Sequence, residues 1–332
     1  MDDITTGVSL QCVDPPDQFK ANVREIEELG YDHLWLADSS LHARYVYTYM
    51  AVAAENSTRL ILGTNCTHPH TRHPALNANA IATVNELSGG RAIFGIGAGD
   101  SPVTELGRPI AKLAEVRSAI ELTRRLYTGE RLDFQGTHFV VNHAGIHFGL
   151  EGVAPPKIYM TASGPQMLEL AGEVADGLIV APGAFREGLE FAIAHVRAGL
   201  DKVGRRWEDF DFCWQVFGAL NDDPAVAREQ ARPLAAWFPK RAPRYCELAG
   251  IDPELVERIR TAYGGGEFHE AAEAINLATD EMVDLFTIAG TPDDWRKRID
   301  MVRSLGVTHV EIFPLGDRMR LVRDFSRLVL GS

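Results

Sequence analysis

Short apolar runs alternate with longer amphipathic stretches along most of this chain. The apolar runs, bounded by glycine, proline or polar residues, predict buried parallel strands, and the amphipathic stretches predict helical crossovers. We expect eight strands, at residues 6–12, 33–37, 60–65, 92–98, 157–161, 177–181, 210–220 and 308–314. We expect helices near residues 17–29, 46–56, 74–87, 110–128, 165–175, 186–203, 223–236, 292–305 and 317–329. Regularly spaced units of this kind predict one α/β domain over residues 1–332, a (β/α)8 TIM barrel, with a doubly wound open sheet as the alternative.

Two segments depart from the repeat. Residues 129–156 predict a small β excursion, with a turn at Gln135-Gly136 between two short strands. Residues 237–290 are longer and contain helical pieces and the run Tyr263-Gly264-Gly265-Gly266. Insertions of this length on a barrel serve as lids or oligomer contacts, and a plain surface decoration is an equal alternative for each.

Composition narrows the class of protein. With 45% hydrophobic and 24% charged residues, the chain is typical of a soluble globular protein. The net charge of -13 argues against nucleic acid and anionic membranes as general partners. Four scattered cysteines, an acidic start at Met1-Asp2-Asp3 and the lack of an 18-residue apolar span predict a cytoplasmic location.

Candidate chemistry concentrates where the predicted strands end, which is where barrels place their active sites. Gly95-Ile96-Gly97-Ala98-Gly99-Asp100 is a glycine-rich strand exit that lets a flat ligand or a phosphate approach the backbone, with a carboxylate directly after it. Asp38 ends another strand, as a catalytic or ligand-orienting acid or as a loop cap. Thr161-Ala162-Ser163-Gly164-Pro165-Gln166 predicts either an anion site at a helix N-terminus or an ordinary helix cap.

No metal site is expected. His68, His70 and His73 are close in sequence, but their spacing does not fit one helix face and no acid lies beside them. The same segment is also explained as a loop that leads into a helix beginning at Pro74.

Several of these motifs together carry a family resemblance. They are residues 27–38, Asn65 to Pro74, Glu86 to Arg91, Gly95 to Asp100, Ala162 to Gly177, Gly290 to Trp295 and Gly306 to Val310. As a set they resemble the bacterial-luciferase-like flavin and deazaflavin oxidoreductases, most of all the F420-dependent branch that includes methylenetetrahydromethanopterin reductase.

The resemblance implies a barrel whose cofactor ring lies across the strand ends, above a cis peptide at Asn65–Cys66. The cofactor tail would run over residues 97–101, and its phosphate would meet the amides of Ala162, Ser163 and Gly164. The cofactor-binding residues implied in this way are Asp38, Thr64, Asn65, Cys66, Gly97, Ala98, Gly99, Asp100, Ser101, Ala162, Ser163, Gly164, Gln166 and Ala181.

The function implied is an F420-dependent oxidoreductase that transfers hydride between the deazaflavin and a small organic substrate. Relatives that oxidise alcohols or sugars often carry a histidine directly after the aspartate that follows the second strand, which is Asp38 here. This chain has Ser39 at that position, which favours reduction of a C=C, C=N or C=O bond. Asp38, Asp100 and, in reserve, His42 are the candidate catalytic proton donors. The alternatives are an FMN-dependent monooxygenase that works with a flavin reductase, and a flavin-binding protein without catalytic activity.

The resemblance also implies a homodimer formed through the helices at 46–56 and 74–87. Apolar area for it could come from Tyr45, Tyr47, Tyr49, Met50 and Leu76, although such residues are also common in cores. The substrate would be selected by the loops after strands 1, 2 and 7 and by residues 237–290.

Overall fold

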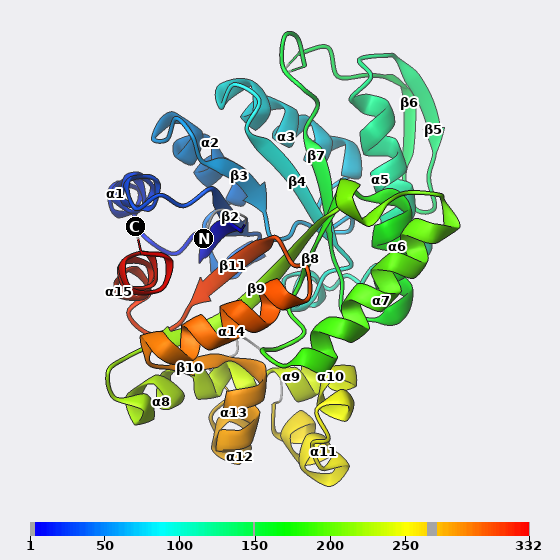
Figure 1. Ribbon diagram of the computed structural model, residues 1–332. Coiled ribbons are helices and arrows are strands. Elements are labelled where there is room, and N and C mark those ends of the chain that lie inside the picture. Colours follow the sequence, from blue (N-terminus) through cyan, green and yellow to red (C-terminus); the bar gives the residue numbers. More distant parts are fainter. Residues whose placement is uncertain (1–3, 149, 264–270, 332) are drawn as a thin grey trace.

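Eight parallel strands close into a barrel in the computed structural model, which describes residues 4–148, 150–263 and 271–331 (Figure 1). Strand β1 pairs with β2 on one side and β11 on the other, and the pairing of β8 with β9 closes the ring. The predicted TIM barrel is therefore confirmed and the open-sheet alternative is wrong. The barrel strands are β1 (Thr5–Gln11), β2 (His33–Ala37), β3 (Ile61–Thr64), β4 (Ala92–Gly97), β7 (Lys157–Thr161), β8 (Gly177–Val180), β9 (Asp211–Leu220) and β11 (His309–Pro314).

Amphipathic helices surround the barrel, and many begin with proline in the first turn, where its missing N–H and fixed φ suit a helix start. In the first helix, Phe19, Val23 and Ile26 are spaced along one face and are buried against the strands. The surrounding helices are α1 (Pro16–Glu28), α2 (Val46–Glu55), α3 (Pro74–Leu87), α5 (Leu113–Leu126), α6 (Pro165–Val174), α7 (Arg186–Lys202), α8 (Pro224–Ala235), α14 (Pro292–Ser304) and α15 (Arg318–Asp324), followed by the π-helical η4 (Phe325–Leu330).

Aromatic rings fill the part of the barrel interior that lies farther from the carboxyl ends of the strands. Trp35 on β2 is fully buried and lies beside Tyr159 and His309. Glycine on the neighbouring strands makes room for the indole, because a Cβ at Gly63 would lie 2.1 Å from Trp35 Cζ3. The barrel interior is thus closely packed around Trp35.

The excursion at 129–156 is confirmed as an antiparallel hairpin of β5 (Leu132–Gln135) and β6 (Val140–Ala144), which lies against α5. Short helices occur at η1 (Ser40–His42), α4 (Ser101–Thr104) and η2 (Trp207–Asp209).

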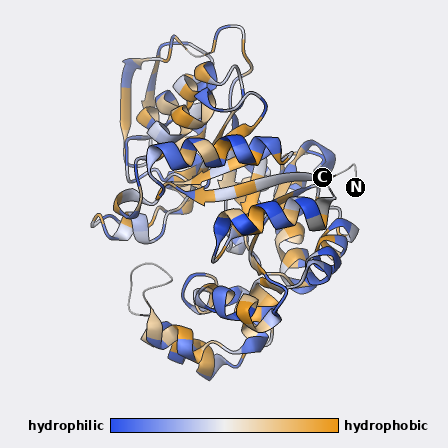
Figure 2. Cartoon of the chain, turned by 90° about the vertical axis from the view of Figure 1, so that its left-hand side faces the viewer, coloured by the Kyte–Doolittle hydropathy of each residue, from blue (hydrophilic) through white to orange (hydrophobic). Residues whose placement is uncertain are grey.

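The segment at 237–290 contains a group of short helices and one short strand beside β9 (Figure 2). Its apolar side chains form a hydrophobic cluster together with residues of β9 and α8, such as Phe217 and Leu234. Phe238 and Phe286 stack at the centre of this cluster, with ring centroids 4.3 Å apart. Of the predicted glycine run, Gly264, Gly265 and Gly266 lie outside the described residues. The elements are α9 (Phe238–Arg241), α10 (Pro243–Leu248), α11 (Pro253–Ala262), α12 (Ala272–Leu277), α13 (Asp280–Phe286) and β10 (Ile288–Gly290).

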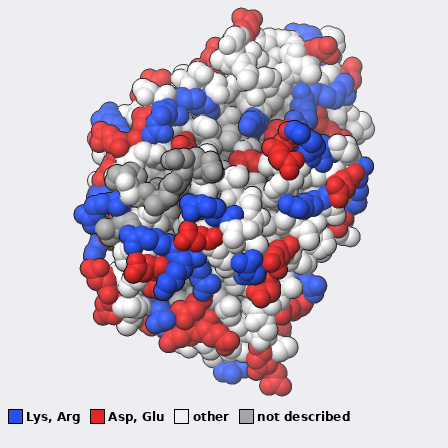
Figure 3. All heavy atoms as spheres, viewed as in Figure 1, with Lys and Arg blue, Asp and Glu red and all other residues white. Residues whose placement is uncertain are grey.

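The predicted dimer residues divide into two groups. Tyr47, Tyr49 and Met50 are buried in the core of the protomer, so the prediction that they supply surface area is wrong. Tyr45 and Leu76 are exposed. On the face shown in Figure 3, basic and acidic side chains are interspersed. Among the described residues, no helix has the length and apolar character needed to cross a membrane.

Candidate active site

A cavity of about 550 Å³ opens at the carboxyl ends of the barrel strands. Its size and position match those of small-molecule sites in barrel proteins. The predicted residues that line it are Asp38, Asn65, Cys66, Ala98, Gly99, Asp100, Ser101, Ala162, Ser163, Gly164 and Ala181.

The remaining predicted residues lie elsewhere. Thr64 and Gly97 are buried just beneath the cavity wall, and Gln166 is exposed on α6. His42 lies on η1, is ion-paired with Glu105 and does not line the cavity. The structure therefore brings the two candidate carboxylates to the cavity and leaves the reserve histidine outside it.

The strand exits of β3 and β4 form the floor of the cavity. The Asn65–Cys66 peptide bond is cis, as the resemblance implies. Thr67 and β4 are joined by hydrogen bonds from Thr67 N to Gly95 O (2.9 Å) and from Gly97 N to Thr67 O (3.0 Å). Burial raises the pKa of the Cys66 thiol to about 12, so Cys66 is a neutral thiol and not a nucleophile at neutral pH.

Asp38 is held by a bidentate ion pair. Arg72 contacts both carboxylate oxygens, with Nη2 2.9 Å from Oδ1, and Thr67 Oγ1 donates to Oδ2 at 2.8 Å. The guanidinium also stacks on Tyr45 and Tyr47, 4.6 and 5.2 Å from the ring centroids. With its side chain only 2% exposed, the Asp38 carboxyl group is held in one orientation in the wall of the cavity.

Asp100 contacts the inserted segment at 237–290. Its carboxylate is ion-paired with Arg241 at the end of α9, and Lys240 and Trp237 from the same segment also line the cavity. Residues 237–241 therefore cover one side of the mouth, which favours a lid over a surface decoration for this part of the insertion.

The N-terminus of α6 faces the cavity through Ala162, Ser163 and Gly164. Pro165 is the first helical residue, and Gly164 makes no side-chain cap, so the amides of this turn are not satisfied by a capping side chain. A helix start of this form suits an anion.

Sequence reasoning missed a polar cluster beneath the floor. Glu311 on β11 is fully buried and accepts hydrogen bonds from Asn65 Nδ2 (2.6 Å) and Gln215 Nε2 (3.0 Å). Burial raises its pKa to about 6, against the opposing effect of its hydrogen bonds. The sequence does contain a sign of this residue, because Val310-Glu311-Ile312 puts a carboxyl group inside an otherwise apolar strand.

His68 was also missed as a cavity residue. It lines the cavity, and burial lowers its pKa to about 4, so the ring is neutral at neutral pH. Among the described residues, no hydrogen-bond partner reaches its buried Nδ1. A neutral imidazole of this kind can donate to or accept from a bound molecule.

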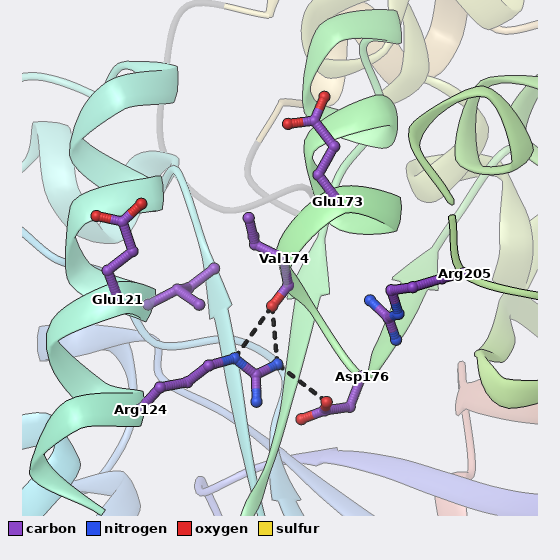
Figure 4. A pocket seen from close by; sticks show the side chains of 7 residues that line it. Glu121, Arg124, Glu173, Val174, Asp176 and Arg205 are labelled. Atoms are coloured by element: carbon purple, nitrogen blue, oxygen red, sulfur yellow. Dashed lines mark hydrogen bonds and ion pairs between the residues drawn. The ribbon is translucent and has the colours of Figure 1, made fainter. Parts of the chain in front are cut away.

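A second hollow, of about 440 Å³, lies at the opposite end of the barrel between α5 and α6 (Figure 4). Arg124 donates to Val174 O and pairs with Asp176 at 2.9 Å. Glu173 is likewise paired with Arg117. These contacts hold α5 and α6 together, which indicates a structural role for the charged residues that make them.

Comparison with known sequences finds a family model and relatives that match this chain over most of its length. The family model for luciferase-like monooxygenases matches residues 2–309. The 5,10-methylenetetrahydromethanopterin reductase of Methanolobus tindarius is 33% identical, covering 99% of this chain and 100% of the relative. The F420-dependent glucose-6-phosphate dehydrogenase of Intrasporangium calvum is 28% identical, covering 92% and 91%.

A solved structure agrees with the sequence comparisons. The coenzyme F420-dependent tetrahydromethanopterin reductase of Methanopyrus kandleri superposes with a TM-score of 0.87 at 27% identity, covering 99% of each chain.

Proposed function

We propose that this chain, which belongs to the luciferase-like monooxygenase family, is an F420-dependent oxidoreductase that transfers hydride between the deazaflavin and a small organic substrate. The observation that carries the proposal is the cavity at the strand ends, which has a glycine-rich floor on one side and a helix N-terminus on the other. The F420-dependent relatives support it, because they align with this chain over nearly its whole length.

The residues present fit a flat cofactor with an anionic tail. A Cβ at Gly97 would lie 2.1 Å from Thr161 Oγ1 and 2.7 Å from Cys66 Sγ, and Gly99 has φ of +98°, so both positions require glycine. The ring would lie over Asn65, Cys66 and Gly97 to Gly99, and the phosphate would be held by the amides at the start of α6. When bound, the deazaflavin supplies or accepts the hydride, which no side chain can do.

The cavity carboxylates favour a particular acceptor. Asp38 and Asp100 are each ion-paired with an arginine, so each carboxyl group already has a cationic partner within the protein. Reduction of a carbonyl group needs a proton at oxygen, whereas a C=N bond that is already cationic accepts hydride without one. We therefore propose a C=N acceptor of the iminium type, which accords with the names of the reductase relatives. A methylene-tetrahydropterin is a neutral aminal, so a proton taken up from solvent at one bridge nitrogen would first break that C–N bond and give the iminium, and the hydride would then add to the methylene carbon.

Lys240 is proposed to recognise an acidic group on the ligand. It lines the cavity on α9, and among the described residues no carboxylate pairs with it. Arg241 beside it is already paired with Asp100. An unpaired ammonium at a cavity mouth attracts an anionic substrate or cofactor tail.

The proposal is tested by titrating the purified apoprotein with oxidised F420 and, separately, with FMN, while cofactor fluorescence is followed. Tight binding of F420 alone, followed by oxidation of reduced F420 on addition of a methylene-tetrahydropterin, is the expected result. Preference for FMN would overturn it and favour a monooxygenase that requires a flavin reductase. Binding of F420 with no turnover on any C=N, C=C or C=O substrate would instead favour a binding protein.

We also propose that the protein is a cytoplasmic homodimer. Cys12, Cys66, Cys213 and Cys246 are all free thiols, as expected in a reducing compartment. Exposed apolar side chains near α2 and α3 support the dimer.

A further inference from the structure

Three segments that are distant in the sequence converge beside the β5–β6 hairpin. His70 lies in the loop before α3, Glu115 in the first turn of α5, and His138 between the two hairpin strands. His70 Nε2 lies 3.4 Å from Glu115 Oε2, and His138 Nδ1 lies 3.7 Å from Glu115 Oε1. One ligand atom from each residue lies within 4.8 Å of the other two.

The hydrogen bonding of His70 fixes which of its nitrogens carries the proton. Nδ1 lies 2.6 Å from Pro109 O, and a carbonyl oxygen can only accept, so Nδ1 must donate. In the neutral ring, Nε2 is then a bare lone pair. That lone pair is buried and faces the Glu115 carboxylate, which is also an acceptor, and no hydrogen-bond donor in the described chain reaches it.

Two acceptors at this distance repel unless a proton or a metal cation lies between them. A backbone carbonyl that orients a histidine through Nδ1–H is also the arrangement found behind metal-ligating histidines. Atoms bound to zinc at about 2.0–2.2 Å in tetrahedral geometry lie roughly 3.3–3.6 Å apart, close to the 3.4 and 3.7 Å that separate the Glu115 oxygens from His70 and His138.

We propose that His70, Glu115 and His138 form a binding site for a divalent transition-metal ion, with zinc as the expected occupant. Two imidazoles and one carboxylate suit zinc better than magnesium or calcium, which prefer oxygen ligands. The side chains of His70 and Glu115 are only 7% and 15% exposed, and that of His138 is 27% exposed, which leaves an approach for the ion and a fourth ligand.

The bound ion would fasten the hairpin to the wall of the candidate active site. His70 is two residues from His68, which lines the cavity, and from Arg72, which holds Asp38. The metal site itself is outside the cavity, so the inference does not depend on the cofactor proposed above.

A matched histidine–glutamate pair elsewhere provides the control. His195 Nδ1 lies 3.0 Å from Glu169 Oε1, but Lys202 also contacts that carboxylate and supplies the positive charge. We therefore expect no metal at His195.

The experiment is equilibrium dialysis of the chelator-stripped full chain against Zn²⁺, with metal analysis, for the wild type and for H70Q, H138Q and H195Q. The wild type and H195Q should bind one equivalent, and H70Q and H138Q should bind more than about 100-fold more weakly, since even loss of an outer-shell partner costs 10–100-fold. Circular dichroism checks that each variant is folded, and H138Q, at the more exposed position, guards against misfolding of H70Q.

Substitution with Co²⁺ identifies the ligands. Visible d–d bands without a thiolate charge-transfer band would support a site of two histidines and one carboxylate. A thiolate band, an absence of bound metal in the wild type, or equal binding by all four proteins would overturn the proposal.

Discussion

Glu311 and Asp38 are both buried carboxyls near the strand ends, but their partners differ in charge. Asp38 is bound by the guanidinium of Arg72, whereas the hydrogen-bond donors to Glu311 include the neutral amides of Asn65 and Gln215. Neutral donors offset only part of the desolvation cost, so burial raises the pKa of Glu311 to about 6. The hydrogen bond that Asn65 donates to Glu311 holds the Asn65 side chain beneath the cavity.

Replacing Glu311 by glutamine should change how stability depends on pH. The folded protein holds the Glu311 proton up to about pH 6, while the unfolded chain releases it near 4.5, so the folded state binds more protons in between. The free energy of unfolding contributed by this group therefore falls as pH rises through that window. E311Q cannot ionise, and relative to the wild type it should gain on the order of 2 kcal/mol between pH 4.5 and 7.

Urea unfolding of both proteins across this pH range measures the difference. His68, whose pKa is lowered to about 4, titrates nearby with the opposite sign, but it is present in both proteins and cancels. A difference that does not vary with pH would show that Glu311 is not protonated in the folded state.

Lys240→Ala should weaken ligand binding without affecting the fold. Loss of the ammonium at the cavity mouth is expected to raise the KM or Kd of an anionic ligand about 10-fold, as for one charge-assisted hydrogen bond. The effect should shrink at high salt, because screening removes the same attraction. Lys202→Ala, at an ion-paired surface lysine on α7, is the control and should leave both constants unchanged.

At the scale of the element, β4 depends on glycine where it passes the bulged end of β3. A Cβ at Gly95 would lie 1.8 Å from the backbone oxygen of Thr64, which cannot move without disturbing the floor. Gly95→Ala should therefore destabilise the protein by at least about 1–3 kcal/mol, the usual cost of overpacking, and should also reduce cofactor affinity.

Gly164→Ala is the matched control for Gly95→Ala. Gly164 has φ of -84°, and a Cβ there would meet nothing within 4 Å, so its unfolding midpoint in urea should stay close to that of the wild type. Equal losses in the two variants would contradict the steric account.

The barrel elements could be predicted because each carries its own local signal. Strands β2 and β7 and helix α3 begin and end at the predicted residues, since apolar runs, proline starts and glycine stops mark them. The three-residue strand β10 is too short to leave a pattern. The pairing of Asp100 with Arg241, and of His70 with Glu115 and His138, depends on contacts across long stretches of sequence, which no local spacing reveals.

At the scale of the whole molecule, the cavity is built by two parts of the chain, the barrel and the segment from 237 onward, which packs on β9 and α8 through a shared hydrophobic cluster. The barrel supplies the floor and both carboxylates, and the segment from 237 onward supplies Trp237, Lys240 and Arg241. The Asp100–Arg241 ion pair joins the two parts directly at the mouth. Substrate choice can therefore change through the insertion while the floor that would hold the cofactor stays the same.

Association of two copies is the remaining prediction at this scale. Leu41, Tyr45 and Leu76 are 86%, 53% and 62% exposed and belong to η1, the start of α2 and the start of α3. Large exposed apolar side chains lose this exposure when a partner covers them. Leu76→Glu should shift the protein from dimer to monomer in sedimentation velocity, whereas Val226→Glu on α8, at an exposed position elsewhere, should not. A wild-type chain that sediments as a monomer at high micromolar concentration would contradict the dimer, and these leucines would then be ordinary exposed residues.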